Sequence, residues 1–399
     1  MIKIYNLLKS IIFYPKYSFI YPEKKLFLVY DKSNFEFFKK YLIPHSYQIF
    51  YTRNEAYNFP ILVETLFKYG LKNLKFNYKT EYIKKSKCKY IITMTDNDLD
   101  FLKIDIKNIK KIAIQNSYRR DAFPDVFSFL KYEKYKIYNL DYIFCFNEAV
   151  GKKYKKYFNC KYIPIGSLRN NLIPKNSNKV KSNNIAFISQ FRSSTVNKKK
   201  NLIFEYSDFI KFIQKPIFKK NNFINLTYSD FYKTDEYVLN NLLKICIQKK
   251  IKLHIIGVMK KNFNEEKQFF SKILKKHNWK YIKRTSSLSS YKNLEKFNLI
   301  FGIDSTMLYE SLARNKNVGF ISARPSCFNN NHAYFGWPLN KKKKGFNWTN
   351  EVNYSEILRI FNNLIFKTKN NRNSNKIILF DHKNLIFQKS LINIMKKKI

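Results

Sequence analysis

The stretch NLIFGIDSTMLYESLARNKNVGFISAR, Asn298 to Arg324, decides the fold class because it joins two apolar runs through a turn and a helix. Leu299 to Phe301 is typical of a short buried strand, and the turn Gly302 to Thr306 follows it. Apolar residues at helical spacing predict a helix from Thr306 to Arg314, and Val318 to Ser322 is the second strand-like run. Strand, helix and strand in this order indicate a parallel sheet with a cleft at the strand ends.

The turn before the predicted helix suits an anion, because several backbone N–H groups converge where a helix begins. Gly302, Asp304, Ser305 and Thr306 lie there. Glu310 follows Thr306 by one helical turn and could face the same ligand. The alternative is an ordinary strand, helix and strand in which Asp304 or Ser305 caps the helix and Glu310 is solvated.

Length and charge bound the class of protein. The chain has 399 residues, which fits two domains, and its formal net charge is +48, from 76 Lys and Arg against 28 Asp and Glu. Such a charge raises nucleic acid as a partner, but the lysines are spread along the chain without a basic arm, so we expect a solvated coat and no specific nucleic-acid binding. The same charge attracts phosphate-bearing substrates and anionic lipid, so we expect peripheral contact with an anionic inner membrane.

The cysteine spacing and the N-terminal stretch indicate the cellular compartment of the protein. The five cysteines form no CxxC pair, which predicts neither a disulfide framework nor a zinc site and fits a reducing cytoplasm. The apolar N-terminal stretch is interrupted by Lys3, Lys9, Pro15 and Lys16 and has no small-residue cleavage site. We therefore expect a cytoplasmic protein without a signal peptide or a transmembrane helix.

Strand-like and helical runs alternate along the chain, which predicts doubly wound domains. We expect an N-terminal, acceptor-side domain over 1–170, a polar linker over 171–184, a nucleotide-sugar-binding domain over 185–350 and C-terminal helices over 351–399. The predicted strands before the opening stretch are Lys25–Tyr30, Tyr47–Phe50, Tyr90–Thr93, Lys111–Ile114, Tyr142–Phe146, Tyr162–Ile165, Ile185–Ser189, Leu253–Gly257 and Tyr281–Lys283. The other predicted helices are Asn58–Tyr69, Glu148–Tyr157, Glu236–Lys249, Glu265–His277 and two pieces around Ile357–Phe366 and Leu385–Met395.

The segment from Asp304 to Arg324 resembles the donor-nucleotide segment of GT-B glycosyltransferases, and more closely that of bacterial surface carbohydrate biosynthesis proteins. Short motifs in matching order extend the resemblance from about Tyr30 to Pro338. They are Arg53-Asn54-Glu55 with Asn58, Thr95-Asp96-Asn97, Gln115-Asn116, Gly166-Ser167 with Asn170-Asn171, Ser189-Gln190-Phe191-Arg192 and Phe335-Gly336-Trp337-Pro338. The resemblance implies two Rossmann-like domains facing a cleft, a phosphate at Ser305 and Thr306, Glu310 on the ribose, and C-terminal helices that fold back over the first domain.

Three further segments could complete the donor site. Ser189 and Arg192 follow the first strand of the second domain, where a guanidinium can grip phosphate. Gly257 could bring backbone close to a nucleotide base, and Arg284 could contact phosphate or base. The alternative for the Ser189 to Arg192 segment and for Arg284 is a surface loop without a ligand. We expect His254, in the strand before Gly257, to be a histidine at the edge of the core and not a ligand.

For the acceptor, a sugar hydroxyl needs a general base. The candidates Glu55, Asp96 and Asp121 follow predicted strands, although Glu55 could cap a helix, Asp96 could form an Asx turn and Asp121 could neutralise two arginines. We favour Asp121, because it ends a long polar segment after a buried strand. The residues predicted to bind the acceptor are Arg53, Gln115, Asn116, Arg119 and Arg120.

The resulting prediction is a metal-independent glycosyltransferase of surface polysaccharide biosynthesis, which moves a sugar from a nucleotide sugar to a glycan or lipid-linked acceptor without a cofactor. We expect no divalent cation at the site, so helix dipole and arginine would stabilise the leaving phosphate. A sugar-nucleotide epimerase would share the site from Asp304 to Glu310 and need no acceptor groove. A nucleic-acid-binding protein is suggested by charge alone.

Overall fold

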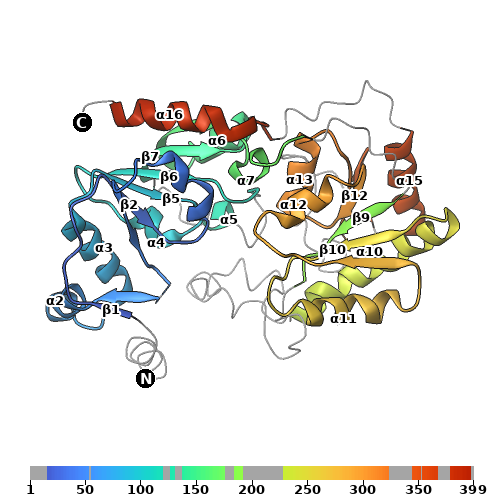
Figure 1. The fold of residues 1–399 in the computed structure, drawn as a ribbon, viewed down its shortest axis with the longest axis horizontal. Coiled ribbons are helices and arrows are strands. Elements are labelled where there is room, and N and C mark those ends of the chain that lie inside the picture. Colours follow the sequence, from blue (N-terminus) through green and yellow to red (C-terminus); the bar gives the residue numbers. More distant parts are fainter. Residues whose placement is uncertain are drawn as a thin grey trace. The chain divides into compact units, whose positions relative to one another are not determined.

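The computed structural model describes residues 16–53, 55–119, 126–130, 137–175, 184–191, 228–322, 344–351, 353–366 and 378–396 (Figure 1). The chain divides into two compact units. Unit 1 comprises Met1–Ser117, Glu133–Leu168 and Lys383–Ile399, and unit 2 comprises Tyr118–Tyr132 and Arg169–His382.

Unit 1 is built on a six-stranded parallel sheet with the order β3-β2-β5-β6-β7-β8. The chain passes from β2 to β3 on one side and continues with β5 on the other, so the strand order reverses between β2 and β5. The strands are β2 (Phe27–Tyr30), β3 (Tyr47–Phe50), β5 (Tyr90–Thr93), β6 (Lys110–Ile114), β7 (Tyr138–Cys145) and β8 (Phe158–Pro164), beside a parallel pair of β1 (Lys16–Ser18) and β4 (Ala56–Asn58).

The helices of unit 1 begin and end where local chemistry favours it. In α2 (Phe59–Tyr69), the side chain of Asn58 accepts a hydrogen bond from the Ile61 N–H, and Gly70 follows the helix with a φ of 61°. The other helices are η1 (Phe35–Phe37), η2 (Lys39–Tyr41), α3 (Leu74–Ser86), α4 (Leu99–Lys103), α6 (Glu148–Tyr154) and α16 (Leu385–Lys396), the last after η9 (His382–Asn384).

A buried lysine of β6 binds the carbonyl groups at the C-terminal end of α4. The Lys111 ammonium donates to the carbonyl oxygens of Leu102 at 3.0 Å and Ile104 at 2.6 Å, which are orphan acceptors at the C-terminal end of that helix. Burial lowers the pKa of Lys111 to about 8, against the opposing charges of Asp105 and Asp141. Lys111 therefore satisfies the helix end at an electrostatic cost.

Unit 2 has a seven-stranded sheet with the order β11-β10-β9-β12-β13-β15-β14, parallel except for β14. The chain runs from β9 outward to β11, then returns to the other side of β9 with β12, so the order reverses between β9 and β12. The strands are β9 (Ile185–Ile188), β10 (Leu253–Ile256), β11 (Trp279–Ile282), β12 (Leu299–Gly302), β13 (Asn317–Ile321), β14 (Lys344–Gly345) and β15 (Trp348–Thr349).

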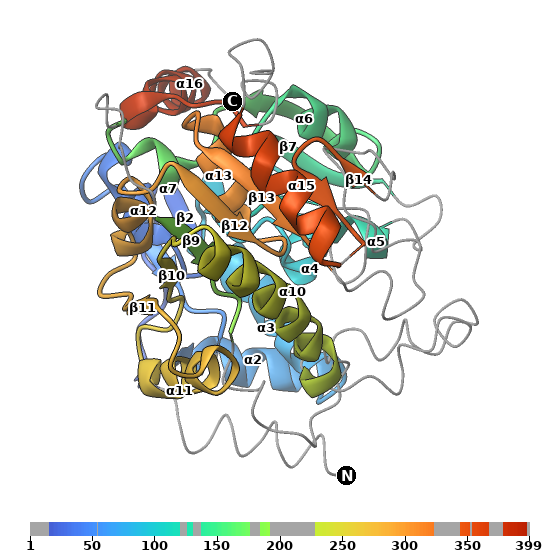
Figure 2. The ribbon, with the colours of Figure 1, turned by 90° about the vertical axis from the view of Figure 1, so that its right-hand side faces the viewer.

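Helices cover both faces of this sheet. Apolar side chains of α10, α11 and α15 share one buried cluster with alternate residues of the strands, and Figure 2 shows α10 and α15 side by side. On the other face, the ring of Phe320 contacts Tyr309 of α13. The helices are α5 (Val126–Leu130), α7 (Leu168–Asn171), α10 (Tyr228–Gln248), α11 (Phe263–Leu274), α12 (Ser289–Leu294), α13 (Thr306–Ala313) and α15 (Tyr354–Ile365).

The α/β fold class predicted from the sequence is confirmed, but the units differ from the predicted domains. Tyr118–Tyr132 belongs to unit 2 and not to the N-terminal unit. Helix α15 also belongs to unit 2, because Ile357, Ile360 and Phe361 are buried in its core, so only α16 of the two C-terminal helices packs in unit 1.

The first part of the predicted linker is fixed to unit 2. The buried guanidinium of Arg314 donates to the carbonyl oxygens of Asn170, Ile173 and Pro174, at 3.2, 2.8 and 2.6 Å. The same side chain forms an ion pair with Glu295. The unit boundary thus falls at Leu168, and residues 169–175 are part of unit 2.

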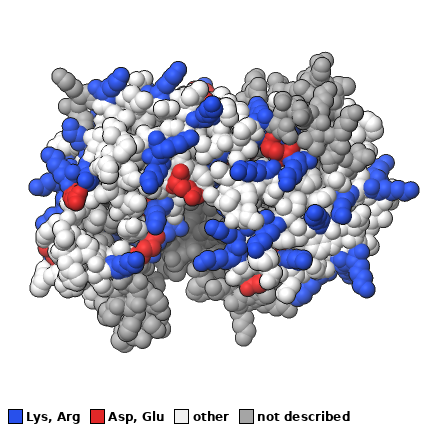
Figure 3. Space-filling model, in the orientation of Figure 1, with Lys and Arg blue, Asp and Glu red and all other residues white. Residues whose placement is uncertain are grey.

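The distribution of charged side chains in the structure agrees with the sequence composition. Lysine and arginine side chains are scattered over the face that Figure 3 shows, with few acidic side chains between them. Among the described residues, no helix is long and apolar enough to span a bilayer. The Phe335–Pro338 motif lies outside the described residues.

Candidate functional site

The reversal of strand order between β9 and β12 locates the candidate site in unit 2. In doubly wound sheets, ligands bind outside the carboxyl ends of the strands at such a reversal. The side chain of Gln190, just after β9, donates a hydrogen bond to the carboxylate of Asp304, just after β12. This bond joins the two loops that flank the reversal, and Asp304 is half-exposed there.

Helix α13 starts beside this bond. Ser305 is its N-cap, and the Ser305 hydroxyl accepts a hydrogen bond from the Met307 N–H at 3.4 Å. The Thr306 hydroxyl accepts one from the Tyr118 N–H at 3.0 Å, and the Tyr118 ring stacks on Tyr309 with centroids 4.0 Å apart. Cap chemistry is therefore present, and the remaining N–H groups and the helix dipole still favour an anion at this end.

Glu310 is buried below the helix start. Its exposed fraction is 1%, so the alternative of a solvated helix residue is wrong. Its carboxylate forms a hydrogen bond with the Tyr291 hydroxyl, which also interacts with Arg169. Burial raises the pKa of Tyr291, the charge of Glu310 raises it further, and the charge of Arg169 opposes both. Tyr291 therefore stays protonated and can donate to the Glu310 carboxylate.

A second buried carboxylate organises the loop after β10. Glu266 of α11 is 0% exposed and accepts hydrogen bonds from the N–H groups of Val258 and Met259, both at 3.0 Å. It also accepts one from the Tyr281 hydroxyl at 2.7 Å. Burial raises the pKa of Tyr281, and the hydrogen bond to Glu266 adds to it. Two of these three donors belong to the loop, so one carboxylate links the loop to α11 and β11.

The loops after β10 and β11 are joined to each other. Arg284 donates to the Val258 carbonyl at 3.1 Å, and the Ser290 hydroxyl donates to the Gly257 carbonyl at 3.2 Å. A Cβ at Gly257 would lie 2.3 Å from the Tyr281 hydroxyl. Packing against Tyr281 alone therefore requires glycine at position 257, whether or not a nucleotide base lies nearby.

In unit 1, polar side chains meet at the reversal between β2 and β5. Asp31 follows β2, is buried and has a φ of 75°. Its Oδ2 accepts from Arg53 Nε at 2.9 Å and Nη2 at 2.8 Å, and from the Thr95 hydroxyl at 3.3 Å. Arg53, a predicted acceptor-binding residue, thus forms an ion pair between its exposed guanidinium and the buried carboxylate of Asp31. The exposed Glu55 accepts a hydrogen bond from the Arg53 N–H.

The other acceptor-side candidates of unit 1 tie strand ends together. Asp96 is buried and accepts from the Asn116 N–H at 3.0 Å and from the Tyr154 hydroxyl. The Gln115 amide donates to the Ser117 carbonyl and accepts from the Phe146 N–H, both at 2.8 Å. Asp96, Asn116 and Gln115 therefore stabilise the loops at the strand ends of unit 1.

The structure brings most predicted donor residues to one edge of the unit 2 sheet. The loops after β9, β10, β11 and β12 carry Ser189, Gly257, Arg284, Asp304 and Ser305. Gly302 ends β12, and Thr306 and Glu310 lie in α13. Arg119 is buried in unit 2, whereas Arg120, Asp121 and Arg192 lie outside the described residues. In the part of the chain that the structure describes, no group of His, Cys, Asp and Glu could hold a metal ion.

Sequence reasoning missed several residues of these clusters. Gln190 is part of the predicted motif Ser189-Gln190-Phe191-Arg192 but has no predicted role, and Asp31 is not predicted, although each lies just after a strand. Glu266, Tyr291 and Tyr118 come from other segments, and their roles depend on contacts distant in sequence.

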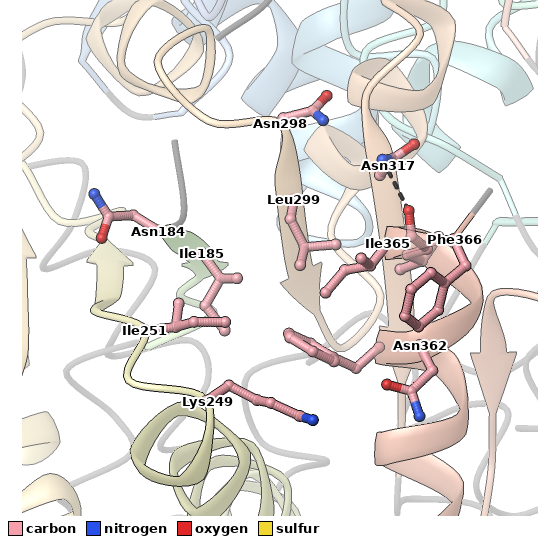
Figure 4. A pocket seen from close by; sticks show the side chains of 12 residues that line it. Asn184, Ile185, Lys249, Ile251, Asn298, Leu299, Asn317, Asn362, Ile365 and Phe366 are labelled. Atoms are coloured by element: carbon pink, nitrogen blue, oxygen red, sulfur yellow. Dashed lines mark hydrogen bonds between the residues drawn. The ribbon is translucent and has the colours of Figure 1, made fainter. Parts of the chain in front are cut away.

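A cavity of about 580 Å³ lies at the opposite edge of the unit 2 sheet (Figure 4). Its lining includes Ile185 and Leu299, which begin β9 and β12, and Phe361 of α15. Because doubly wound sheets bind ligands at the carboxyl ends of their strands, we place the candidate site at the Gln190 to Asp304 edge and not in this cavity.

Comparisons with known proteins agree with this architecture. The structure of S. aureus MnaA with UDP is similar with a TM-score of 0.52 and 11% identity, covering 93% of this chain and 96% of that one. The UDP-GlcNAc 2-epimerase from Neisseria meningitidis bound to UDP-GlcNAc gives a TM-score of 0.48 and 11% identity, covering 94% and 100%. The wall teichoic acid polymerase TagF gives 0.44 and 10%, covering 93% and 89%.

The likeness to S. aureus MnaA establishes the fold alone at 11% identity, and the prediction of Rossmann-like units of the GT-B type is confirmed. No curated protein matches the sequence. A family model described as "putative O-antigen biosynthesis protein" matches residues 112–399, well over half of the chain. This match covers the whole candidate site of unit 2. The chain therefore belongs to this family of O-antigen biosynthesis proteins.

Proposed function

We propose that this protein is a glycosyltransferase of bacterial surface polysaccharide biosynthesis, which transfers a sugar from a nucleotide sugar to a glycan or lipid-linked acceptor. The observation that carries the proposal is the edge of unit 2 at the β9 and β12 reversal, where the Gln190 to Asp304 bond, the start of α13 and buried Glu310 come together. Membership in the O-antigen family supports the biological setting.

In this proposal the donor diphosphate lies at the start of α13, where Ser305 and Thr306 expose backbone N–H groups to it. Glu310 receives the ribose hydroxyls, held in position by Tyr291. The loops fixed by Glu266 and Arg284 line the base. The chain supplies these contacts from rigid strand ends, as a preorganised site requires.

Transfer needs a hydroxyl of the acceptor to attack the anomeric carbon while the bond to the nucleoside diphosphate breaks. The hydroxyl proton passes to a carboxylate base. The helix dipole and arginine stabilise the leaving diphosphate without a metal ion. The two hydrogen bonds that Asp96 accepts within unit 1 favour Glu55 or Asp121 over Asp96 as this base.

We place the enzyme in the cytoplasm, in peripheral contact with the anionic inner membrane, where a lipid-linked acceptor would be met. The net charge of +48 supports such contact.

The test is product analysis with a panel of nucleotide sugars, each with and without membrane lipid extract as the source of acceptor. A transferase releases free nucleotide only when acceptor is present. Conversion of the sugar nucleotide to its epimer without acceptor would instead establish the alternative of an epimerase. The Glu310→Gln variant serves as the donor-site control in both assays.

A further inference from the structure

The outer face of α2 in unit 1 is unusually apolar for a surface helix. Ile61, Leu62 and Thr65 are buried, while Phe59 and Phe67 are 43% and 89% exposed on the remaining surface of the helix. Val63 lies between them at a spacing of four residues, half-exposed, and Leu71 continues the series just after the helix at 43% exposure.

The segment after β1 extends this surface. Phe19 and Ile20 are 69% and 80% exposed, and the ring of Phe19 lies 5.4 Å from that of Phe59. Figure 1 shows β1 beside α2. We call Phe19, Ile20, Phe59, Val63, Phe67 and Leu71 the α2 face. Clustered exposed apolar side chains of this kind mark interaction sites on protein surfaces.

The charges around the α2 face are mainly basic. Lys68 and Lys72 are exposed next to Phe67 and Leu71 in the chain. The one acidic residue of α2, Glu64, is neutralised by an ion pair with Lys85 at 2.7 Å and by a hydrogen bond from Tyr21. Lys68 shares the Glu81 carboxylate with Lys84, at 3.7 and 2.9 Å, so basic groups outnumber carboxylates around the face. Apolar side chains flanked by such an excess of basic groups complement an anionic lipid surface, where the apolar groups enter the acyl boundary and the lysines meet head groups.

We propose that the α2 face docks unit 1 on an anionic lipid bilayer. A second copy of the chain is a poorer partner, because it would bring like basic groups together in a protein with a net charge of +48. The inference rests on the membrane contact of the proposed function and assigns that contact to named residues. The test of this inference needs neither donor nor acceptor. Membrane docking through the α2 face can therefore be disproved while transfer activity is confirmed, and transfer activity can be disproved while docking is confirmed.

The test is co-sedimentation of the full chain with vesicles of phosphatidylcholine alone and of equal parts phosphatidylcholine and phosphatidylglycerol. Binding to the anionic vesicles is expected to fall about tenfold or more in Phe67→Ser. Phe67→Trp should retain it, since indole also partitions into the interface. Phe366→Ser in unit 2 is the matched control, because Phe366 is 77% exposed, and it should bind as the wild type does.

The contribution of charge is tested with the double variant Lys68→Gln and Lys72→Gln. The control is the double variant Lys272→Gln and Lys276→Gln, which removes the same charge from exposed positions in and after α11 of unit 2. Only the first pair should lower binding. Equal losses from both pairs, or equal behaviour of Phe67→Ser and Phe366→Ser, would mean unspecific attraction and overturn the proposal. A Phe67→Ser variant that changes from dimer to monomer without vesicles would show that a second copy covers the face, which also overturns it.

Discussion

The hydroxyl of Tyr281 donates a hydrogen bond to Oε2 of Glu266 at 2.7 Å, which joins β11 to α11 beneath the loop that follows β10. The same carboxylate accepts from two backbone N–H groups of that loop. A single buried side chain therefore links three segments of the candidate donor site.

Replacing Glu266 with Gln should lower the free energy of unfolding by roughly 1–3 kcal/mol, because the new amide N–H₂ would face donors where the carboxylate accepted from them. Urea unfolding measures the loss. The neighbouring Glu265 is exposed, so Glu265→Gln is the control and should leave the unfolding midpoint in place. Equal stability of the two variants would show that the loop does not depend on this carboxylate.

The burial of Glu310 changes what its replacement predicts. Glu310→Gln should weaken nucleotide-sugar affinity about tenfold or more if the carboxylate binds the ribose, and it should also lower stability, because Tyr291 loses an ionised partner. Tyr291→Phe is the separating variant. It removes the hydroxyl, costs about 1 kcal/mol of stability, and leaves the carboxylate for the ligand.

Thermal shift and calorimetric titration with the nucleotide sugar that the product assay selects would compare these two variants. Donor affinity lost in Glu310→Gln and kept in Tyr291→Phe supports the ribose role. Equal affinity in both would assign Glu310 to the packing of unit 2 alone.

The general base is identified by comparing Asp121→Asn, Glu55→Gln and Asp96→Asn. Loss of the base should lower the chemical step by about 10² to 10⁴ with donor affinity preserved. Asp96→Asn should instead lower the melting temperature, since Asp96 accepts from Asn116 and Tyr154 in the unit 1 core. If Asp121→Asn turns over normally and Glu55→Gln does not, the base is Glu55.

Lys111 predicts a pH dependence of stability. Its pKa in the folded protein is about 8, against 10.5 for an ordinary lysine, so between these pH values the unfolded chain binds more protons than the folded one. The contribution of Lys111 to the free energy of unfolding should therefore rise with pH by about 3 kcal/mol across this window. Below pH 8 both states are charged and the contribution is constant.

The measurement is the difference in unfolding free energy between wild type and Lys111→Met as a function of pH, since the subtraction removes the tyrosines and cysteines that titrate in the same range. Lys110→Met, at the partly exposed neighbour, is the matched control for the loss of one lysine. A flat difference for Lys111→Met would mean that its ammonium is solvated in the folded state.

The strands could be predicted from sequence because buried parallel strands are short apolar runs, as in Tyr90–Thr93 and Tyr47–Phe50, where the predicted and observed bounds agree. Helix α3 was missed, because polar residues such as Lys79 and Glu81 occupy its buried side and weaken the apolar periodicity. In those positions the buried charges pair with Asp100 and Lys84, which no local pattern reveals.

The candidate site shows the same division. The positions of Asp304, Ser305 and Thr306 at a helix start follow from local spacing and could be predicted. The contacts of Thr306 with Tyr118 and of Glu310 with Tyr291 depend on how separate segments pack, so sequence periodicity could neither bury Glu310 nor place Tyr118 in unit 2.

The place of α16 in unit 1 has a consequence for how the protein is made. Phe387 of α16 packs against Phe144 of β7, and the Tyr90 hydroxyl donates to the Ile394 carbonyl. Since these partners are separated by more than half of the chain, unit 1 lacks part of its core while the ribosome is still synthesising unit 2. Unit 2 can therefore form its own core first, and unit 1 is complete only after α16 has left the exit tunnel.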